Sequence, residues 1–108
     1  MPVHVLHSKH QLEEVLQKSS QLVVIKFGAK WCGPCKTMNP IFHAFSEKHK
    51  DILCVEVDAD EMSEVLEEYN VSSLPTFLCL KKKTVLTSLK GAVQASVLES
   101  TILAQKSK

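Results

Sequence analysis

The sequence predicts an α/β fold in which a central mixed β-sheet is flanked by α-helices on both faces. Segments with strand-like and helix-like apolar patterns alternate over residues 3–69, and two further strand-like segments precede a last helix. The segments 21–27 and 51–57 are apolar on both faces, as expected of parallel strands buried between helices. Alternating strands and helices followed by a β-hairpin imply a sheet that contains both parallel and antiparallel strands and is covered by helices. We therefore expect the order β-α-β-α-β-α-β-β-α, with residues 1–108 forming a single domain.

Short-range patterns indicate the first three elements. The alternation of apolar and polar side chains in residues 3–6 predicts a short strand. Ser8 and Gln11 form a capping-box pattern that opens a helix. The apolar face of that helix consists of Leu12, Val15 and Leu16. The central strand that follows reads QLVVIKF, and Lys26 is its one charged residue.

Two helices and a strand are predicted for the middle of the chain. Residues 35–48 carry apolar side chains at i, i+3, i+4 and i+7, which is one face of a helix: Met38, Ile41, Phe42 and Phe45. Pro40 lies inside this pattern and is expected to kink the helix. After the strand at 51–57, Asp60 is expected to cap the next helix. Its apolar face consists of Met62, Val65, Leu66 and Tyr69.

The last part of the chain predicts a hairpin and a helix. Strand-like residues 76–80 and 84–89 flank three consecutive lysines at 81–83, which is a hairpin pattern. The turn contains no glycine, so its geometry is left open by the sequence. Apolar and small residues at helical spacing predict the final helix: Val97, Leu98, Thr101 and Ile102.

Length, composition and charge narrow the classes of function. A chain of 108 residues with 44% hydrophobic residues is sufficient for one domain with a core. The formal net charge of +1 gives no strong attraction to nucleic acid or to an anionic membrane. No apolar run approaches the roughly 20 residues that cross a bilayer. We therefore expect neither a nucleic-acid nor a membrane partner.

Cysteine usage and the N-terminal stretch suggest a reducing compartment. Residues 1–11 lack the basic start and apolar run of a secretory signal. Four cysteines are too few for a disulfide scaffold of this size. Cys54 and Cys79 stand alone in apolar runs and are expected to be buried. These features predict a cytoplasmic protein, and nothing in the sequence suggests a covalent dimer, so a monomer is expected.

The pair Cys32 and Cys35 has three chemical interpretations. A zinc site needs four ligands, and the other cysteines and the five histidines are scattered, so no metal site is expected. A structural disulfide closing so short a loop would constrain the unfolded chain little. A redox pair fits the position, because the two residues follow a buried strand and open a helix. The first helical turn favours a thiolate at Cys32, and Cys35 lies one turn further along.

The residues around the pair resemble the thioredoxin family. The motif WCGPCK at 31–36 is similar to the thioredoxin active site. Further matches occur in order along the whole chain: Phe27, Ala29, Pro40, VDAD at 57–60, LPTF at 74–77 and GA at 91–92. The resemblance implies the thioredoxin fold and the activity of a protein-disulfide reductase.

This resemblance also implies a reaction cycle and its partners. Cys32 would attack the disulfide of a target protein, and Cys35 would displace the reduced target. Thioredoxin reductase, using NADPH, would then restore the dithiol, and no cofactor would be bound to the chain itself. The expected partners are thus thioredoxin reductase and disulfide-containing proteins.

A substrate groove is implied beside the cysteines. Leu74–Pro75 would be a cis peptide facing them, since X–Pro is the common setting for a cis bond. The backbone beside Pro75 would pair with an extended segment of the substrate. The apolar rim would be formed by Trp31, Gly33, Pro34, Leu74, Gly91 and Ala92.

Lys26 departs from the family pattern, because thioredoxins generally have a buried aspartate there that helps to move the proton of the second cysteine. Three interpretations are open. The lysine could extend to solvent, it could stay buried and charged beside Glu56 on the neighbouring strand, or burial could convert it to a neutral base for Cys35. A charged Lys26 would favour the thiolate and make the protein a weaker reductant. The alternative function is a redox-regulated binding module with weak turnover.

Overall fold

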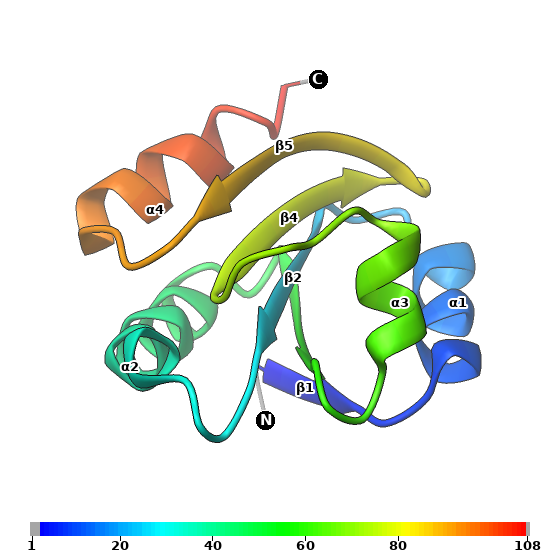
Figure 1. The fold of residues 1–108 in the computed structure, drawn as a ribbon. Helices are drawn as coiled ribbons and strands as arrows, with labels where there is room; N and C mark the ends of the chain where they lie inside the picture. Colours follow the sequence, from blue (N-terminus) through cyan, green and yellow to red (C-terminus); the bar gives the residue numbers. More distant parts are fainter. Residues whose placement is uncertain (1–2, 108) are drawn as a thin grey trace.

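The computed structural model describes residues 3–107 and contains the nine elements in the expected order. Figure 1 shows a sheet with helices on its two sides. The strands are β1 (Val3–Leu6), β2 (Val23–Gly28), β3 (Leu53–Asp58), β4 (Thr76–Lys81) and β5 (Thr84–Lys90). The helices are α1 (Lys9–Lys18), α2 (Gly33–Lys48), α3 (Ser63–Glu68) and α4 (Ala95–Leu103).

The sheet is mixed, as predicted, with the strand order β1-β3-β2-β4-β5. β1, β3 and β2 run parallel, whereas β4 is antiparallel to both β2 and β5. β2 therefore lies at the centre of the sheet, and its six residues are all buried. Its C-terminal end leads directly into the cysteine segment, so the best-buried strand fixes the position of the site.

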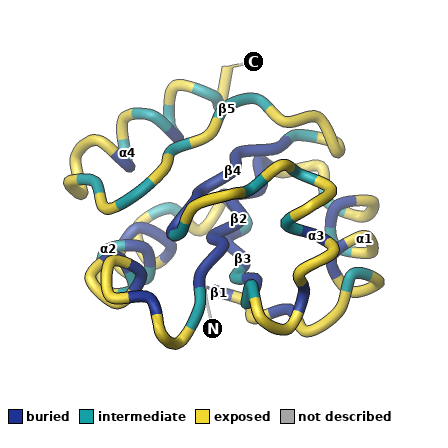
Figure 2. Tube along the Cα trace, in the orientation of Figure 1, coloured by how far each residue is buried: buried dark blue, intermediate teal, exposed yellow. Residues whose placement is uncertain are grey.

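Two apolar layers cover the two faces of the sheet. Figure 2 shows the central strand β2 between them in the dark blue of buried residues. On one face, α2 and α4 contribute Met38, Phe42, Phe45, Leu98 and Ile102. On the other face, α1 and α3 contribute Leu12, Leu16 and Val65. Side chains of a strand alternate between faces, and so the buried β2 residues divide between the layers. Val24 belongs to the α2 face, whereas Val23, Ile25 and Phe27 belong to the α1 face.

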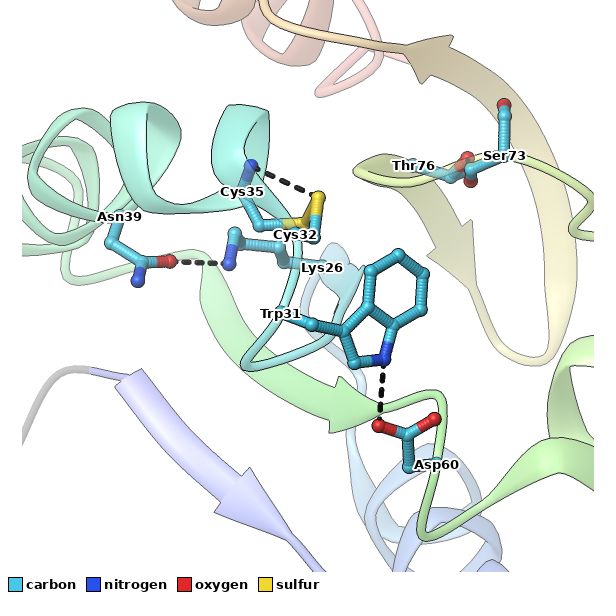
Figure 3. The surroundings of a disulfide bond; sticks show 8 residues. All are labelled: Lys26, Trp31, Cys32, Cys35, Asn39, Asp60, Ser73 and Thr76. Carbon is cyan, nitrogen blue, oxygen red and sulfur yellow. Dashed lines mark hydrogen bonds between the residues drawn. A yellow bond between two sulfur atoms is a disulfide. The ribbon is translucent and has the colours of Figure 1, made fainter.

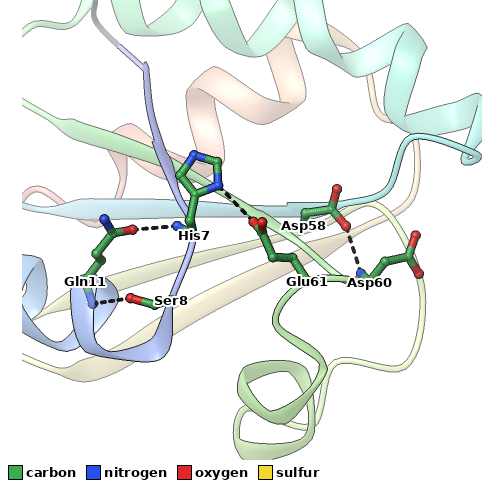
Figure 4. A network of polar contacts seen from close by, with 6 residues as sticks. All are labelled: His7, Ser8, Gln11, Asp58, Asp60 and Glu61. Carbon is green, nitrogen blue, oxygen red and sulfur yellow. Dashed lines mark hydrogen bonds and ion pairs between the residues drawn. The ribbon is translucent and has the colours of Figure 1, made fainter.

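Local signals set the ends of the helices, with one error in the prediction. The Ser8 hydroxyl accepts a hydrogen bond from the Gln11 N–H at 3.1 Å, as the capping pattern predicted (Figure 4). The expected cap of α3 at Asp60 was wrong, because the N-cap is Met62, without a side-chain bond. Asp60 instead lies in a turn that Asp58 stabilises, with the Asp60 N–H donating to Asp58 Oδ1 at 2.8 Å. α2 begins at Gly33 and continues through Pro40.

The β4–β5 hairpin is closed by lysines in an unusual conformation. Lys82 and Lys83 have φ values of 49° and 71°, in the left-handed region that glycine or asparagine usually occupies. Two consecutive left-handed residues match the twist of a two-residue hairpin. The missing glycine therefore did not prevent a tight turn. The turn joins the strand ends remote from Pro75, which immediately precedes β4.

Candidate active site

The cysteine pair lies where β2 passes into α2. Cys32 is the N-cap of α2 and Cys35 is in its first turn. The two are joined by a disulfide with Cα atoms 5.3 Å apart, which represents the oxidised state (Figure 3). The Cys35 N–H donates to Cys32 Sγ at 3.2 Å. The predicted redox arrangement, with one sulfur at the helix N-terminus and the other a turn along, is present.

This position favours a negative charge on Cys32. The first N–H groups of a helix have no partner within the helix and carry partial positive charge. Pro34 lies in the first turn and has no N–H. The next N–H, that of Cys35, donates to the Cys32 sulfur. When the disulfide is reduced, the same N–H can donate to a Cys32 thiolate, and a thiolate is the attacking form of cysteine.

A hollow of about 450 Å³ opens beside Cys32. Its lining includes four residues of the predicted rim, namely Trp31, Gly33, Pro34 and Leu74. Trp31 is 69% exposed, which is unusual for so large an apolar side chain. Its indole N–H donates to Asp60 Oδ2 at 2.8 Å and thereby holds the ring at the mouth of the hollow. Asp60 was missed as a site residue because this contact crosses 29 positions of sequence.

The loop before β4 forms the other side of the site. The Leu74–Pro75 bond is cis, as predicted. The Thr76 hydroxyl donates to the Ser73 carbonyl at 2.7 Å, and the Gly91 N–H donates to the Pro75 carbonyl at 2.8 Å. Gly91 is therefore fixed next to Pro75, with Ala92 exposed beside it. Neither Gly91 nor Ala92 lines the hollow of Trp31 and Leu74.

Lys26 is buried behind the cysteines. It is 4% exposed on the α2 face of β2, so the interpretation that it extends to solvent was wrong. Its Nζ donates a hydrogen bond to Asn39 Oδ1 (Figure 3). Burial lowers the pKa of Lys26, while the charge of Glu56 opposes that shift. Sequence reasoning missed Asn39, although its position four residues after Cys35 places both on one helix face.

The expected contact between Lys26 and Glu56 is not an ion pair. The two residues are register partners on β2 and β3, yet the ion pairs found within residues 3–107 do not join them. Glu56 Oε1 instead lies 3.4 Å from His43 Nε2 on α2. The same oxygen is buried without a hydrogen bond. Helix α2 thus supplies a closer partner to each side chain, and Glu56 acts on Lys26 only through its charge.

The remaining cysteines are chemically inert. Cys54 and Cys79 are buried, and burial raises the pKa of each thiol to about 12. Within residues 3–107, no three His, Cys, Asp or Glu side chains are grouped to hold a metal ion. None of the helices in this part of the chain is both long and apolar enough to cross a membrane. The nucleophilic chemistry therefore belongs to Cys32 and Cys35.

A cysteine pair at a helix N-terminus, beside a cis-proline and an exposed tryptophan, defines the site of a thiol–disulfide oxidoreductase. Comparison with known proteins agrees with this class. The thioredoxin family pattern matches residues 3–104. Thioredoxin of Oryctolagus cuniculus is 41% identical over 101 residues, covering 93% of this chain and 95% of the rabbit protein. The chain thus belongs to the thioredoxin family, and it is a thioredoxin-type disulfide oxidoreductase.

Solved structures and longer relatives extend this comparison. The crystal structure of a thioredoxin from Nicotiana alata has a TM-score of 0.91 and 36% identity, over 97% of this chain and 93% of that one. Thioredoxin domain-containing protein 2 of Homo sapiens is 43% identical over 93 residues. That match covers 85% of this chain but 17% of the human protein, so the chain spans a small part of this longer relative.

Proposed function

We propose that this chain is a protein-disulfide reductase of the thioredoxin kind, working as a single domain over residues 1–108. The observation that supports this proposal most directly is the disulfide at the N-terminus of α2, which borders an open hollow. An exposed tryptophan and a cis-proline loop flank that hollow. A purely structural disulfide would need neither an open surface nor a helix N-terminus.

In the first step, the Cys32 thiolate attacks one sulfur of a disulfide in the target protein. A bond forms between Cys32 and that sulfur, and the second target sulfur leaves as a thiolate. In the second step, Cys35 loses its proton and attacks Cys32 Sγ. The mixed disulfide breaks, the target leaves as a dithiol after taking up protons, and the Cys32–Cys35 bond holds the oxidised state. Two electrons have passed to the target.

The loop at Leu74 is suited to hold the target in an extended conformation. Leu74 lines the hollow with Trp31 and Cys32. The backbone N–H and C=O of Leu74 form no backbone hydrogen bond with other residues in 3–107. A strand-like segment of the target can pair with these groups. Gly33, Pro34, Gly91 and Ala92 would then border the bound segment.

The proposed partners are those that membership of the thioredoxin family implies, and they suit the stoichiometry of the cycle. Each turnover leaves a disulfide that needs two electrons, and the proposed source is NADPH through thioredoxin reductase. The proposed substrates are disulfide-containing proteins, with no cofactor bound to the chain. A reducing, cytoplasmic setting would keep the dithiol available, and a monomer would leave the hollow open. A net charge of +1 gives no reason to add a nucleic acid or a membrane to these partners.

The test is NADPH oxidation in the presence of thioredoxin reductase, this protein and insulin. We expect continuous NADPH oxidation that depends on all three proteins, with insulin chains precipitating as their disulfides open. Heat-denatured protein is the control. Oxidation no faster than this control, together with partner binding that changes with the redox state of the pair, would instead indicate a binding module. The buried Lys26 is the observation that makes that second function worth testing.

A further inference from the structure

A polar cavity lies beside Cys35 and shares no lining residue with the substrate hollow. It measures about 230 Å³, and its lining includes Lys26, Cys35, Asn39 and Glu56. Exposed Lys30 also lines it, so the cavity reaches the surface. Most of the α2 face of the sheet is apolar, and this group of polar side chains therefore stands out as a built feature rather than ordinary core.

Lys26 and Cys35 both lie next to Gly28. A Cβ atom at Gly28 would lie 3.2 Å from Lys26 Nζ and 3.3 Å from Cys35 Sγ. The separation of Nζ and Sγ thus cannot exceed the two distances combined. Lys26 Nζ and the Cys35 side chain supply the three heavy atoms nearest to that point. The absence of a side chain at Gly28 leaves the space that both groups share.

The contacts of Lys26 can stabilise an ammonium group, although burial lowers the pKa of Lys26. Nζ donates to the carbonyl oxygen of the Asn39 side chain, which can accept but cannot take a proton from it. The Glu56 charge on the adjacent strand opposes the effect of burial on the lysine. An uncompensated buried ammonium would cost several kcal/mol, and here an acceptor and a carboxylate reduce that cost.

We propose that Lys26 and Asn39 act together as a positively charged couple that stabilises the thiolate of Cys35 from behind. Asn39 orients the ammonium, and the ammonium favours the loss of the Cys35 proton to solvent through the cavity. Cys35 is then ready to attack the mixed disulfide without a protein base. Lys26 is a positioning residue here, since it acts through Cys35. The redox consequence rests on the proposed disulfide exchange, whereas the thiol titration does not.

Some of the other charged groups around Lys26 favour a Cys35 thiolate, and others disfavour it. Glu56 and Asp58 approach the cavity from β3, His43 faces Glu56 from α2, and Lys30 stands at the mouth. The two carboxylates disfavour a Cys35 thiolate. Glu56 is 3.4 Å from His43, which offsets its charge when the imidazole is protonated. Lys26 is the charged group that lies next to Gly28 together with Cys35. Its positive charge is therefore expected to have the largest effect on the Cys35 thiol.

The direct test is the titration of Cys35 by NMR of 13Cβ-labelled cysteine in a Cys32→Ser background, which removes coupling between the two thiols. Lys26→Met should lower the acid dissociation constant of Cys35 about tenfold, the order expected for one charge at this separation. Cys54 and Cys79 are not expected to interfere, because burial raises the pKa of each thiol to about 12. Lys50→Met, at an exposed position outside the cavity, is the charge-matched control and should change nothing.

Two further variants separate charge from packing. Lys26→Arg keeps the charge and should stay within about twofold of the parent, while Asn39→Ala should shift the titration in the same direction as Lys26→Met but less. Removing a buried ammonium does not require loss of stability, so Lys26→Met is expected to fold. An unchanged Cys35 titration in folded Lys26→Met, or an equal shift in Lys50→Met, would overturn the proposal.

The redox readout uses the native pair in glutathione buffers. Lys26→Met should favour the disulfide, because the thiolate of the reduced state has lost its stabilising charge. The measured quantity is the equilibrium constant for oxidation of the pair by glutathione disulfide. The ratio of this constant in Lys26→Met to that in the wild type should rise with pH towards about tenfold, which corresponds to a difference of about 30 mV in reduction potential. The ratio should fall again at pH values where Lys26 itself loses its proton, since burial lowers the pKa of Lys26. A ratio that is constant with pH would contradict a charge effect.

Discussion

Replacing Cys32 with serine should abolish disulfide reduction in the coupled assay. The hydroxyl of serine is not ionised at neutral pH, so the helix N-terminus has no anion to stabilise and the first exchange step cannot begin. No other thiol is expected to substitute for it. Cys35 does not line the hollow beside Cys32, and Cys54 and Cys79 are buried, which raises the pKa of each thiol to about 12. The expected rate is that of the assay without the protein.

Replacing Cys35 with serine should give a different failure. Cys32 can still attack, but nothing within the chain resolves the product, so a mixed disulfide with the target should accumulate. Non-reducing electrophoresis and intact mass measurement would detect this adduct, and dithiothreitol should release it. The Cys54→Ala variant is the matched control and should retain activity. Substantial turnover by Cys32→Ser, or no adduct with Cys35→Ser, would contradict the assigned roles.

The Phe42→Ala substitution should produce a large loss of stability. Phe42 is fully buried, and its ring meets that of Phe77 edge-on with centroids 5.5 Å apart. This contact joins α2 to β4 in the layer beneath the active site. Truncating a buried phenylalanine costs about 3–5 kcal/mol, since transfer and cavity terms add. That is a large part of the roughly 5–15 kcal/mol that stabilises a typical domain.

Urea unfolding followed by circular dichroism measures this loss. The control is Val97→Ala on α4, where the side chain is 41% exposed and a change below about 0.5 kcal/mol is expected. The reduction potential of the Phe42→Ala protein should also be measured, since α2 carries both cysteines. A destabilisation below about 1.5 kcal/mol would mean that the site collapses around the missing ring.

Most of the fold could be predicted because its signals are local and periodic. The four helices follow from apolar spacing, and α1 also from its cap at Ser8. β2 and β3 follow from runs that are apolar on both faces. The boundaries differ by about two residues, since strand ends depend on pairing, and pairing is a long-range property. β2, for example, begins at Val23, the residue aligned with the first residue of β3, Leu53.

The cysteine pair was predictable because its two residues are only three positions apart in sequence, but the surrounding contacts were not. The couple of Lys26 and Asn39 joins a strand to a helix, and the bond from Trp31 to Asp60 joins two loops. Each depends on which of several polar groups comes closest after packing. Glu56 was the reasonable partner for Lys26 from strand pairing alone, yet α2 brings Asn39 to the lysine and His43 to Glu56.

Disulfide reduction by this chain requires that Cys32 be a thiolate nucleophile at neutral pH. The most direct measurement is the rate of iodoacetamide modification of the reduced protein against pH, with mass spectrometry identifying the modified residue. We expect Cys32 to react first. The pH at which it reaches half of its maximal rate should lie clearly below about 8.5, which is the pKa of an ordinary cysteine thiol. A rate profile for Cys32 like that of free cysteine, or earlier modification of Cys54 or Cys79, would show that Cys32 is not an activated nucleophile.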